Sequence, residues 1–269
     1  MIKKNECGGT FLEARAADLT RRAANGIPVC WDFLSPADQQ TLVRAVNALG
    51  EHDRLLLWGG YADAERKKAF FLPDHLMPVP GDEELPELIE AAFGNPLAAL
   101  ELSGSGYREL TNRDWLGAVL NLGLERAALG DLRTADAETA FLICERPAAQ
   151  LLLSELERVG RDAVRVREIG FSELWERLPA REFLPVSDTV PAARLDAVVG
   201  ALCRIAREKA KLLVLSGAVQ RMGEPLQKPD AEVAEGDILS VRGYGKFRIL
   251  SVSEKNKKGR LRLSAEKYV

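Results

Sequence analysis

Glycine-containing turns divide the stretch 194–269 into two short helical segments followed by several short strands. The segments 197–204 and 206–216 are predicted to be helices, and Gly217 is expected to end the second one, since glycine readily adopts the left-handed conformation that closes a helix. Further turns are expected to separate the strands, at 223–224, 235–237, 243–245 and 257–259. This pattern predicts two helices packed on a small twisted sheet, which makes a complete α+β unit.

The same part of the chain holds a surplus of positive charge. Residues 191–269 contain 16 Lys and Arg against 9 Asp and Glu, a balance of +7, whereas residues 1–190 carry −10 and the whole chain −3. Such polarity predicts a basic module for a polyanion attached to an acidic body. A solvated face could hold the same excess, but a tail of solvated lysines would be repetitive, and this stretch is not.

Residues 89–178 are predicted to form a ferredoxin-like (RRM-like) domain. The order of the expected elements is β-α-β-β-α-β, with strands at 97–102, 130–134, 139–144 and 163–169 and helices at 111–122 and 147–159. Thr111 and Asp114 stand at capping-box spacing at the start of the first helix. The strand 139–144 lacks the exposed aromatic and basic residues of a standard RRM strand, so a scaffold or protein-contact role is as well supported there as direct RNA readout.

Residues 1–88 are predicted to contain an N-terminal helix and a small α/β unit. The helix is expected at 10–26, and a second helix begins after Ser35, which can serve as N-cap ahead of a proline. Strands are expected at 55–58 and 69–72, with a glycine turn and a helix or turn over 63–68 between them.

Three prolines mark the stretch between the central and C-terminal domains. Pro179, Pro185 and Pro191 predict a linker, or an extended strand, over 179–193. The expected domains are therefore 1–88, 89–178 and 194–269, with 179–193 as the linker.

Composition excludes several classes of protein. No apolar run reaches the ~18–20 residues that a membrane-spanning helix needs, and no apolar core follows the first lysines as in a secretory signal. We therefore expect a cytoplasmic protein with no cofactor and no metal. The residues that could form a disulfide framework or a metal site are few and scattered, namely Cys7, Cys30, Cys144, Cys203, His52 and His75.

Catalytic motifs are weak throughout the chain. The loop 104–109 half-resembles a dinucleotide-binding loop but lacks its third glycine, and no Walker-type loop is present. His75 is expected at the surface, and Cys144 ends a predicted core strand, where burial is expected rather than nucleophilic reactivity. The sequence therefore predicts a protein that is not an enzyme.

A set of motifs in the C-terminal stretch resembles the S-four-type RNA-binding domain (the αL motif). The motifs are Arg194-Leu195-Asp196, Ala206-Arg207-Glu208-Lys209-Ala210, Ser216-Gly217-Ala218-Val219 and Glu235-Gly236-Asp237-Ile238-Leu239-Ser240-Val241. That domain is shared by a small-subunit ribosomal protein, pseudouridine synthases and some tRNA synthetases. The resemblance implies that this stretch binds structured RNA.

Further motifs narrow the resemblance to the YlmH family of three-part RNA-binding proteins. They are Arg242-Gly243-Tyr244-Gly245-Lys246-Phe247, the basic end 257–260 with Lys267-Tyr268, and, upstream, Gly59-Gly60-Tyr61 and Ala64-Glu65-Arg66-Lys67. The match covers nearly the whole chain after about residue 28. The chain departs from the family where Ala206 replaces a frequent serine and Met222-Gly223 replaces an Asn-Gly turn.

The family resemblance implies a function on the ribosome. It implies a soluble factor that binds ribosomal RNA and tRNA on the free large subunit carrying peptidyl-tRNA after a stalled ribosome has split, and that contributes to quality control. We expect no membrane span and a monomer in solution. Two alternatives remain open: an RNA-modifying, pseudouridine synthase-like enzyme, and an adaptor for cell division or photosynthetic membranes.

Arginine and lysine residues are the candidate RNA contacts, because planar guanidinium groups bind phosphate oxygens through two donors and stay charged at cellular pH. Arg204, Arg207 and Lys211 would share one helix face if their helix were continuous. The predicted RNA-binding residues are Arg194, Arg204, Arg207, Lys209, Lys211, Arg221, Arg242, Lys246 and Arg248. A second contact is considered at Arg66, Lys67 and Lys68, although a glycine turn with a charged helix explains that segment at least as well.

The segment 242–247 has a further interpretation, because it overlaps the opening of the RRM stacking motif. Lys246 stands where a stacking aromatic belongs, so a structural hairpin is favoured over a base-stacking platform.

Overall fold

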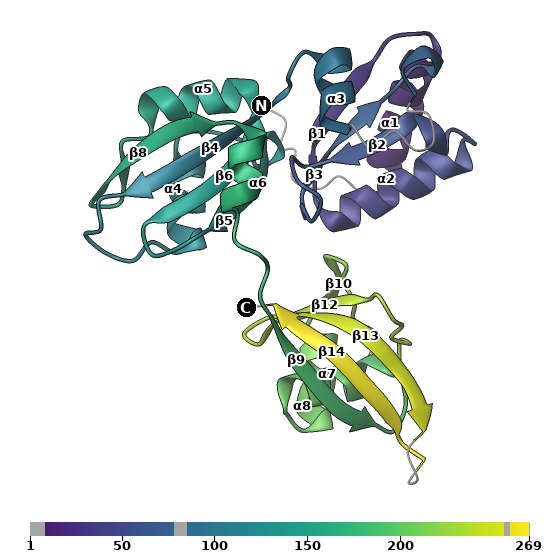
Figure 1. The fold of residues 1–269 in the computed structure, drawn as a ribbon. Coiled ribbons are helices and arrows are strands. Elements are labelled where there is room, and N and C mark those ends of the chain that lie inside the picture. Colours follow the sequence, from purple (N-terminus) through teal and green to yellow (C-terminus); the bar gives the residue numbers. More distant parts are fainter. Residues whose placement is uncertain (1–8, 78–84, 256–258, 269) are drawn as a thin grey trace. The chain divides into compact units, whose positions relative to one another are not determined.

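The computed structural model describes residues 9–77, 85–255 and 259–268 (Figure 1). It contains α-helices and antiparallel sheets, which confirms the α+β class. The chain divides into two compact units, Met1–Pro179 and Ala180–Val269, which we call unit 1 and unit 2.

The N-terminal part of unit 1 packs two helices on a three-stranded sheet of order β1-β3-β2. Ser35 caps the second helix as expected, since its hydroxyl accepts a hydrogen bond from the Asp38 amide at 3.2 Å. Residues 63–66 form a turn, which is one of the two alternatives expected for 63–68, and Lys67 and Lys68 already belong to a strand. The first strand of the unit was not expected. The elements are α1 (Gly9–Ala24), β1 (Val29–Leu34), α2 (Pro36–Ala48), η1 (His52–Arg54), β2 (Leu55–Trp58), β3 (Lys67–Phe71) and η2 (Asp74–Leu76).

The central part of unit 1 is a five-stranded antiparallel sheet of order β5-β6-β4-β8-β7. The helix that begins at Asn112 carries the expected capping box, in which Thr111 and Asp114 exchange hydrogen bonds with each other's backbone amides. The predicted helix over 147–159 ends at Glu155, and a short strand follows it. The elements are α3 (Leu85–Phe93), β4 (Leu97–Gly104), α4 (Asn112–Asn121), η3 (Arg126–Ala128), β5 (Leu129–Thr134), β6 (Thr139–Glu145), α5 (Arg146–Glu155), β7 (Arg158–Val159), β8 (Asp162–Ile169) and α6 (Phe171–Arg177).

Both faces of this central sheet carry buried side chains. On one face Leu100 and Leu142 pack against Trp115 of α4 and the apolar side of α5. On the other, Phe141 and its neighbours pack against residues of the N-terminal part and of α6. Much of the second face is therefore buried in a core shared with the N-terminal part and α6.

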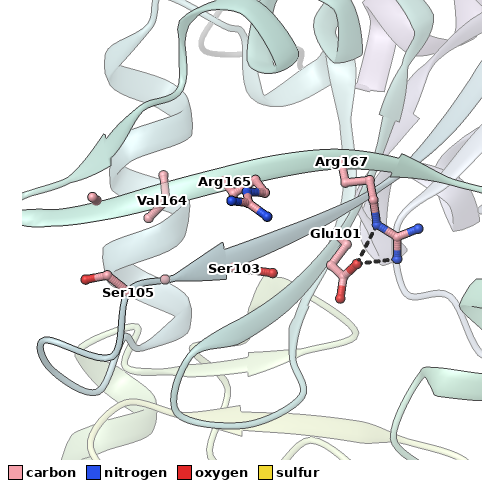
Figure 2. Close-up of a pocket in the computed structure, with 8 residues that line it drawn as sticks. Glu101, Ser103, Ser105, Val164, Arg165 and Arg167 are labelled. Carbon is pink, nitrogen blue, oxygen red and sulfur yellow. Dashed lines mark hydrogen bonds and ion pairs between the residues drawn. The ribbon is translucent and has the colours of Figure 1, made fainter.

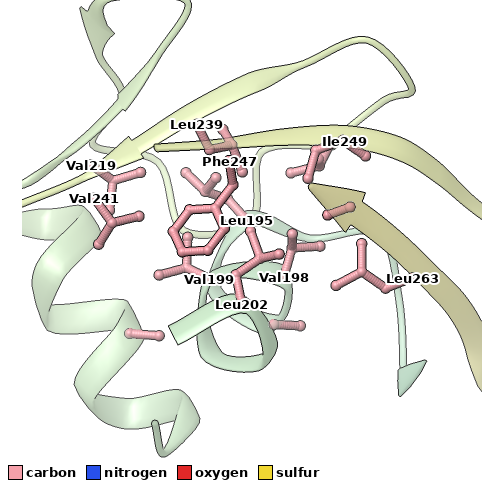
Figure 3. Close-up of a cluster of buried hydrophobic side chains, with 14 of the residues drawn as sticks. Leu195, Val198, Val199, Leu202, Val219, Leu239, Val241, Phe247, Ile249 and Leu263 are labelled. Atoms are coloured by element: carbon pink, nitrogen blue, oxygen red, sulfur yellow. The ribbon is translucent and has the colours of Figure 1, made fainter. Parts of the chain in front are cut away.

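Unit 2 packs two helices on a six-stranded antiparallel sheet of order β11-β10-β12-β13-β14-β9. Figure 3 shows Leu195 and Val198 of α7 packed with Phe247 and Leu263 of the sheet, all fully buried. Burying each such side chain contributes about 1.5–3 kcal/mol. The elements are β9 (Phe183–Val190), α7 (Leu195–Cys203), α8 (Arg207–Leu215), β10 (Val219–Arg221), β11 (Glu224–Pro225), β12 (Ile238–Val241), β13 (Gly245–Lys255) and β14 (Leu261–Tyr268).

The stretch predicted as a linker over 179–193 contains β9, which pairs with β14 along its whole length. The linker prediction is wrong for these residues, and the extended-strand alternative describes them. Pro185 is tolerated because β9 is an edge strand, which pairs with a neighbour on one side only. The missing N–H of proline costs less there than in a central strand. Proline therefore marked an edge strand here rather than a connection between domains.

Candidate RNA-binding surface

A buried carboxylate organises two of the predicted arginines in unit 2. Asp196, in the first turn of α7, has a side chain that is only 4% exposed. The Arg194 Nε atom lies 3.2 Å from its Oδ1, and the Arg207 Nη2 atom lies 2.9 Å from its Oδ2. The carboxylate therefore joins the residue before α7 to the first residue of α8.

The ionised form of Asp196 is favoured in the fold. Burial alone raises the pKa of this carboxyl, but hydrogen bonds from Arg194 and Arg207, together with their charges, outweigh it and bring the pKa below its ordinary value. Both arginine side chains remain about half exposed. Because guanidinium carries five N–H donors, each arginine is held in place while further donors stay available for a phosphate.

Arg204, Arg207 and Lys211 do not lie on one continuous helix, in agreement with the two separate helices predicted at 197–204 and 206–216. Arg204 is the C-cap of α7, in the left-handed conformation with φ 53° and ψ 48°, and α8 begins only at Arg207. Arg207 and Lys211 still share a face of α8, one helical turn apart. Arg204 therefore lies in the turn between the helices rather than in the same helical row.

The helices bring further exposed cations beside this pair. Arg204, Lys209 and Lys211 are exposed, and Lys209 lies 5.9 Å from the ring centroid of Tyr244. In the described part of the chain, Arg204 and Lys211 form no ion pair. Leu212 and Leu215 are 66% and 49% exposed, because Ala210 and Val214 take the buried positions of α8.

The remaining predicted residues of unit 2 lie elsewhere. Arg221 of β10 is partly used in the fold, since its Nε lies 3.1 Å from Asp237 and its Nη1 donates to the Glu232 carbonyl at 2.9 Å. Arg242 is exposed in the turn between β12 and β13. Lys246 and Arg248 belong to β13, on the opposite side from its buried Phe247. The nine residues thus do not form one surface.

The helix surface consists of the residues around the α7–α8 junction, namely Arg194, Arg204, Arg207, Lys209 and Lys211. It combines two guanidinium groups fixed by a buried carboxylate with exposed cations. Such an arrangement suits the phosphate backbone of a folded RNA.

The geometry favours the structural alternative for the second contact considered in unit 1. Arg66 is largely buried, and its guanidinium donates to the backbone carbonyls of Phe33, Arg126 and Leu129. Burial lowers its pKa, although Asp131 opposes that shift. Lys68 is 4% exposed and ion-paired with Glu145.

Lys67, in β3 and half-buried, is the remaining member of that trio. The charges of Arg66 and Lys68 therefore serve the internal structure of unit 1.

The upstream glycine-tyrosine motif has the same structural role. Gly60 has φ 91°, and a Cβ atom there would lie 2.9 Å from Phe171 and 3.0 Å from Ile143. The Tyr61 hydroxyl donates to Asp131 at 2.6 Å, and the same carboxylate accepts the Arg66 amide at 2.9 Å. The motif thus connects the N-terminal part of unit 1 to the central sheet. The sequence of the motif did not indicate this role.

The central sheet does not present an RRM-type stacking face. Phe141 of β6 is 2% exposed, and the Arg177 guanidinium lies 5.2 Å from its ring centroid. Beyond it is an open depression of about 500 Å³, where Arg167 forms hydrogen bonds to Glu101 (Figure 2). Hydrogen bonds keep the pKa of Glu101 below its ordinary value, the one from Arg177 having a larger effect than the one from Arg167. Partial burial acts in the opposite direction. A carboxylate held ionised by two arginines is poorly suited to donate a proton.

Two cysteine thiols in the described residues are poor nucleophiles in the fold. Burial raises the pKa of Cys144 to about 12 and that of Cys203 to about 11, so neither thiol ionises readily. Cys7 lies outside the described residues. Within the described ranges no group of His, Cys, Asp and Glu is arranged to hold a metal ion. None of the helices described has the length and hydropathy to span a bilayer.

Comparison with known proteins identifies the class and then the family. A family model described as "Putative RNA-binding domain in YlmH" matches residues 93–173, so the chain contains a domain of an RNA-binding class. The chain is 33% identical over 238 residues to the Bacillus subtilis (strain 168) "Ribosome-associated protein quality control protein P2", covering 88% of this chain and 86% of that protein. The chain belongs to the YlmH family.

A solved structure is also similar. It is the "Cell division protein ylmH from Streptococcus pneumoniae", which is 18% identical, with a TM-score of 0.48, covering 64% of this chain and 98% of that chain.

Proposed function

We propose that this protein is a non-catalytic RNA-binding factor that acts on the large ribosomal subunit carrying peptidyl-tRNA, in the quality control of stalled translation. Unit 2 contacts ribosomal RNA and tRNA through the helix surface. The observation that carries this proposal is the pair Arg194 and Arg207, fixed on buried Asp196 yet half exposed. The ribosome-associated name of the Bacillus subtilis relative supports the setting.

Topology supports a finer domain assignment. In unit 2, α7 and α8 precede the strands β10 to β14, as an S-four-type (αL) domain requires. In the central part of unit 1, the sheet order β5-β6-β4-β8 supports a ferredoxin-like domain with α4 and α5 on one face. The first binds RNA through the helix surface, and the second, which the RNA-binding family model matches, also positions the N-terminal part.

The proposed mechanism is binding by charge and shape. Arginines held on Asp196 need not be ordered when RNA arrives, which reduces the entropic cost of binding. A-form RNA hides its base edges in a deep, narrow groove, so a helix bearing Arg207 and Lys211 would recognise the backbone geometry. Each phosphate contact releases counterions, so binding weakens steeply as salt rises.

We further propose that the protein performs no chemistry, works in the cytoplasm and is a monomer. The raised pKa of the buried Cys144 thiol and the arginine-paired Glu101 support the first part of this proposal. The ribosome-associated relative supports the second. Peptidyl-tRNA chemistry is then left to the ribosome.

Cosedimentation with purified large subunits tests the proposal. The wild-type chain should pellet with the subunits at low salt and be released as KCl rises. The double variant Lys209→Ala, Lys211→Ala should pellet less. A matched control removes the same two charges from α1 (Arg21→Ala, Arg22→Ala) and should pellet like wild type. Wild-type protein that stays in the supernatant at low salt refutes the ribosomal setting.

A further inference from the structure

The sheet of unit 2 has a second basic face, opposite α7 and α8. Phe247 and Ile249 of β13 lie in the core with the helices. Because side chains alternate along a strand, Lys246 and Arg248 lie on the other face. In Figure 1 both helices lie on the same side of this sheet. Among the described residues of unit 2, no helix covers the opposite side, which we call the open sheet face.

Two aromatic rings lie together on the open sheet face. Phe183 of β9 and Tyr268 of β14 are register partners, with ring centroids 5.0 Å apart and planes at 68°. Leu263 and Ala265 of β14 are buried, so Tyr268 belongs to the alternate set of residues that points away from the core. Both rings are partly exposed rather than covered.

Cations flank these rings. The Lys246 Nζ atom lies 4.9 Å from the Tyr268 ring centroid, and the Arg248 Cζ atom lies 4.8 Å from that of Phe183. Arg248 is also held by Glu266, whose Oε2 lies 2.5 Å from its Nη2. These contacts set the position of each charge relative to a ring.

Positive charge continues along the same face. Arg262 of β14 is exposed and belongs to the alternate set that includes Glu266 and Tyr268. Arg260 donates to the Thr189 carbonyl at 2.5 Å, which places it beside β9. The face thus joins a stacking element, formed by two rings, to a row of cations.

We propose that the open sheet face binds an unpaired segment of RNA. A nucleobase stacks on the Phe183–Tyr268 pair and on the Arg248 guanidinium, while Lys246 contacts a flanking phosphate. Arg262, six residues from Tyr268 along β14, contacts a phosphate further along the same RNA segment. Rings and guanidinium planes bind the flat faces of bases only where those bases are unstacked, so this chemistry selects single strands. The helix surface, in contrast, has the chemistry for a backbone of defined shape.

This inference rests on the proposed function and extends it. If unit 2 binds folded RNA through the helix surface, the open sheet face allows it to hold a second, unpaired segment at the same time. Two RNA elements are then bridged by one small domain. Separate sites for folded and unpaired RNA also explain why the predicted basic residues lie on opposite sides of one sheet.

Fluorescence anisotropy of the full chain with two labelled probes tests the inference. One probe is a short unpaired oligoadenylate, and the other is an RNA hairpin with a fully paired stem and a minimal loop. The double variant Phe183→Leu, Tyr268→Leu keeps apolar volume but removes the rings, and should weaken oligoadenylate binding about tenfold while sparing the hairpin. The matched variant Lys209→Ala, Lys211→Ala should mainly weaken hairpin binding.

A second variant protects the test against misfolding. Lys246→Gln with Arg262→Gln leaves the rings in place and should also weaken oligoadenylate binding selectively. If both open-face variants bind oligoadenylate like wild type, or if every variant weakens both probes equally, the open sheet face is not a separate RNA site. If polyglutamate displaces oligoadenylate and the protein does not distinguish oligoadenylate from the hairpin, the open sheet face fits an acidic protein partner. That result would overturn the assignment.

The outcome is independent of the ribosome experiment. Failure to pellet with large subunits, combined with selective loss of oligoadenylate binding, would reject the ribosomal setting and retain the open sheet face. Pelleting by wild type, combined with unchanged oligoadenylate binding by both open-face variants, would retain the setting and reject the open sheet face.

Discussion

Replacing Asp196 with asparagine should destabilise unit 2 measurably. The side chain is 4% exposed and accepts hydrogen bonds from both Arg194 and Arg207. Asparagine keeps the size but offers one acceptor oxygen, and its amide group then faces a guanidinium donor. One charged hydrogen-bond interaction, usually about 1.5–3 kcal/mol, is lost. The freed arginine is half exposed and regains water, so we expect a net loss of about 1–3 kcal/mol.

The chain provides an internal control for this measurement. Its four tryptophans, Trp31, Trp58, Trp115 and Trp175, all belong to unit 1. Hydrogen exchange of the α7 amides at neutral pH should therefore show the loss in unit 2. Tryptophan fluorescence during urea unfolding should report an unchanged transition for unit 1.

The effect should also depend on pH. Because the folded-state pKa of Asp196 lies below its ordinary value of about 4, the stabilisation is fully present above pH 4 and is lost as pH falls through the folded pKa. The difference between wild type and Asp196→Asn should therefore shrink in acid. Equal exchange protection in both proteins at pH 7, or a difference that grows in acid, would refute the reasoning.

Three further predictions concern charge, burial and reactivity. Lys209→Ala with Lys211→Ala should change the free energy of unfolding by no more than about 0.5 kcal/mol. The same variant should lower the slope of log binding constant against log KCl concentration by about 1–2 for the hairpin, as measured by anisotropy at several KCl concentrations. Lys68→Ala should lower the urea midpoint of tryptophan fluorescence, with a loss of about 3–5 kcal/mol, because Glu145 loses its buried partner; a loss below about 1 kcal/mol would contradict that role. Cys144, whose pKa is raised to about 12, should resist iodoacetamide at pH 8 until urea unfolds the chain, as peptide mass spectrometry would reveal; rapid native labelling would contradict its burial.

Local signals in the sequence predicted much of the fold. The capping box at Thr111 and the N-cap at Ser35 are both present, because these interactions involve residues only three positions apart. The strand beginning at Leu97 and the helix ending before Gly217 were also found, since apolar runs and glycine are strong local signals. Prediction was weakest for the strand 29–34, whose pattern mixes polar with apolar side chains.

The candidate site was only partly predictable, because its geometry depends on partners distant in sequence. The motif Arg194-Leu195-Asp196 indicated a charged group, but not that Asp196 would bind Arg207, eleven residues further on. The left-handed conformation of Arg204 is a property of the tertiary turn. Lys68 looked like a surface cation because nothing nearby shows that Glu145, 77 residues away, would bury it.

Pro185 gives β9 a further consequence for association between molecules. An edge strand offers unpaired backbone donors and acceptors to any extended chain that meets it, and exposed Leu184 would strengthen such an encounter. A proline ring interrupts that row of amides and obstructs the approach of another strand. Pro185 therefore protects this edge against pairing with a strand of another molecule. Alanine at this position would permit such aggregation at the same protein concentration.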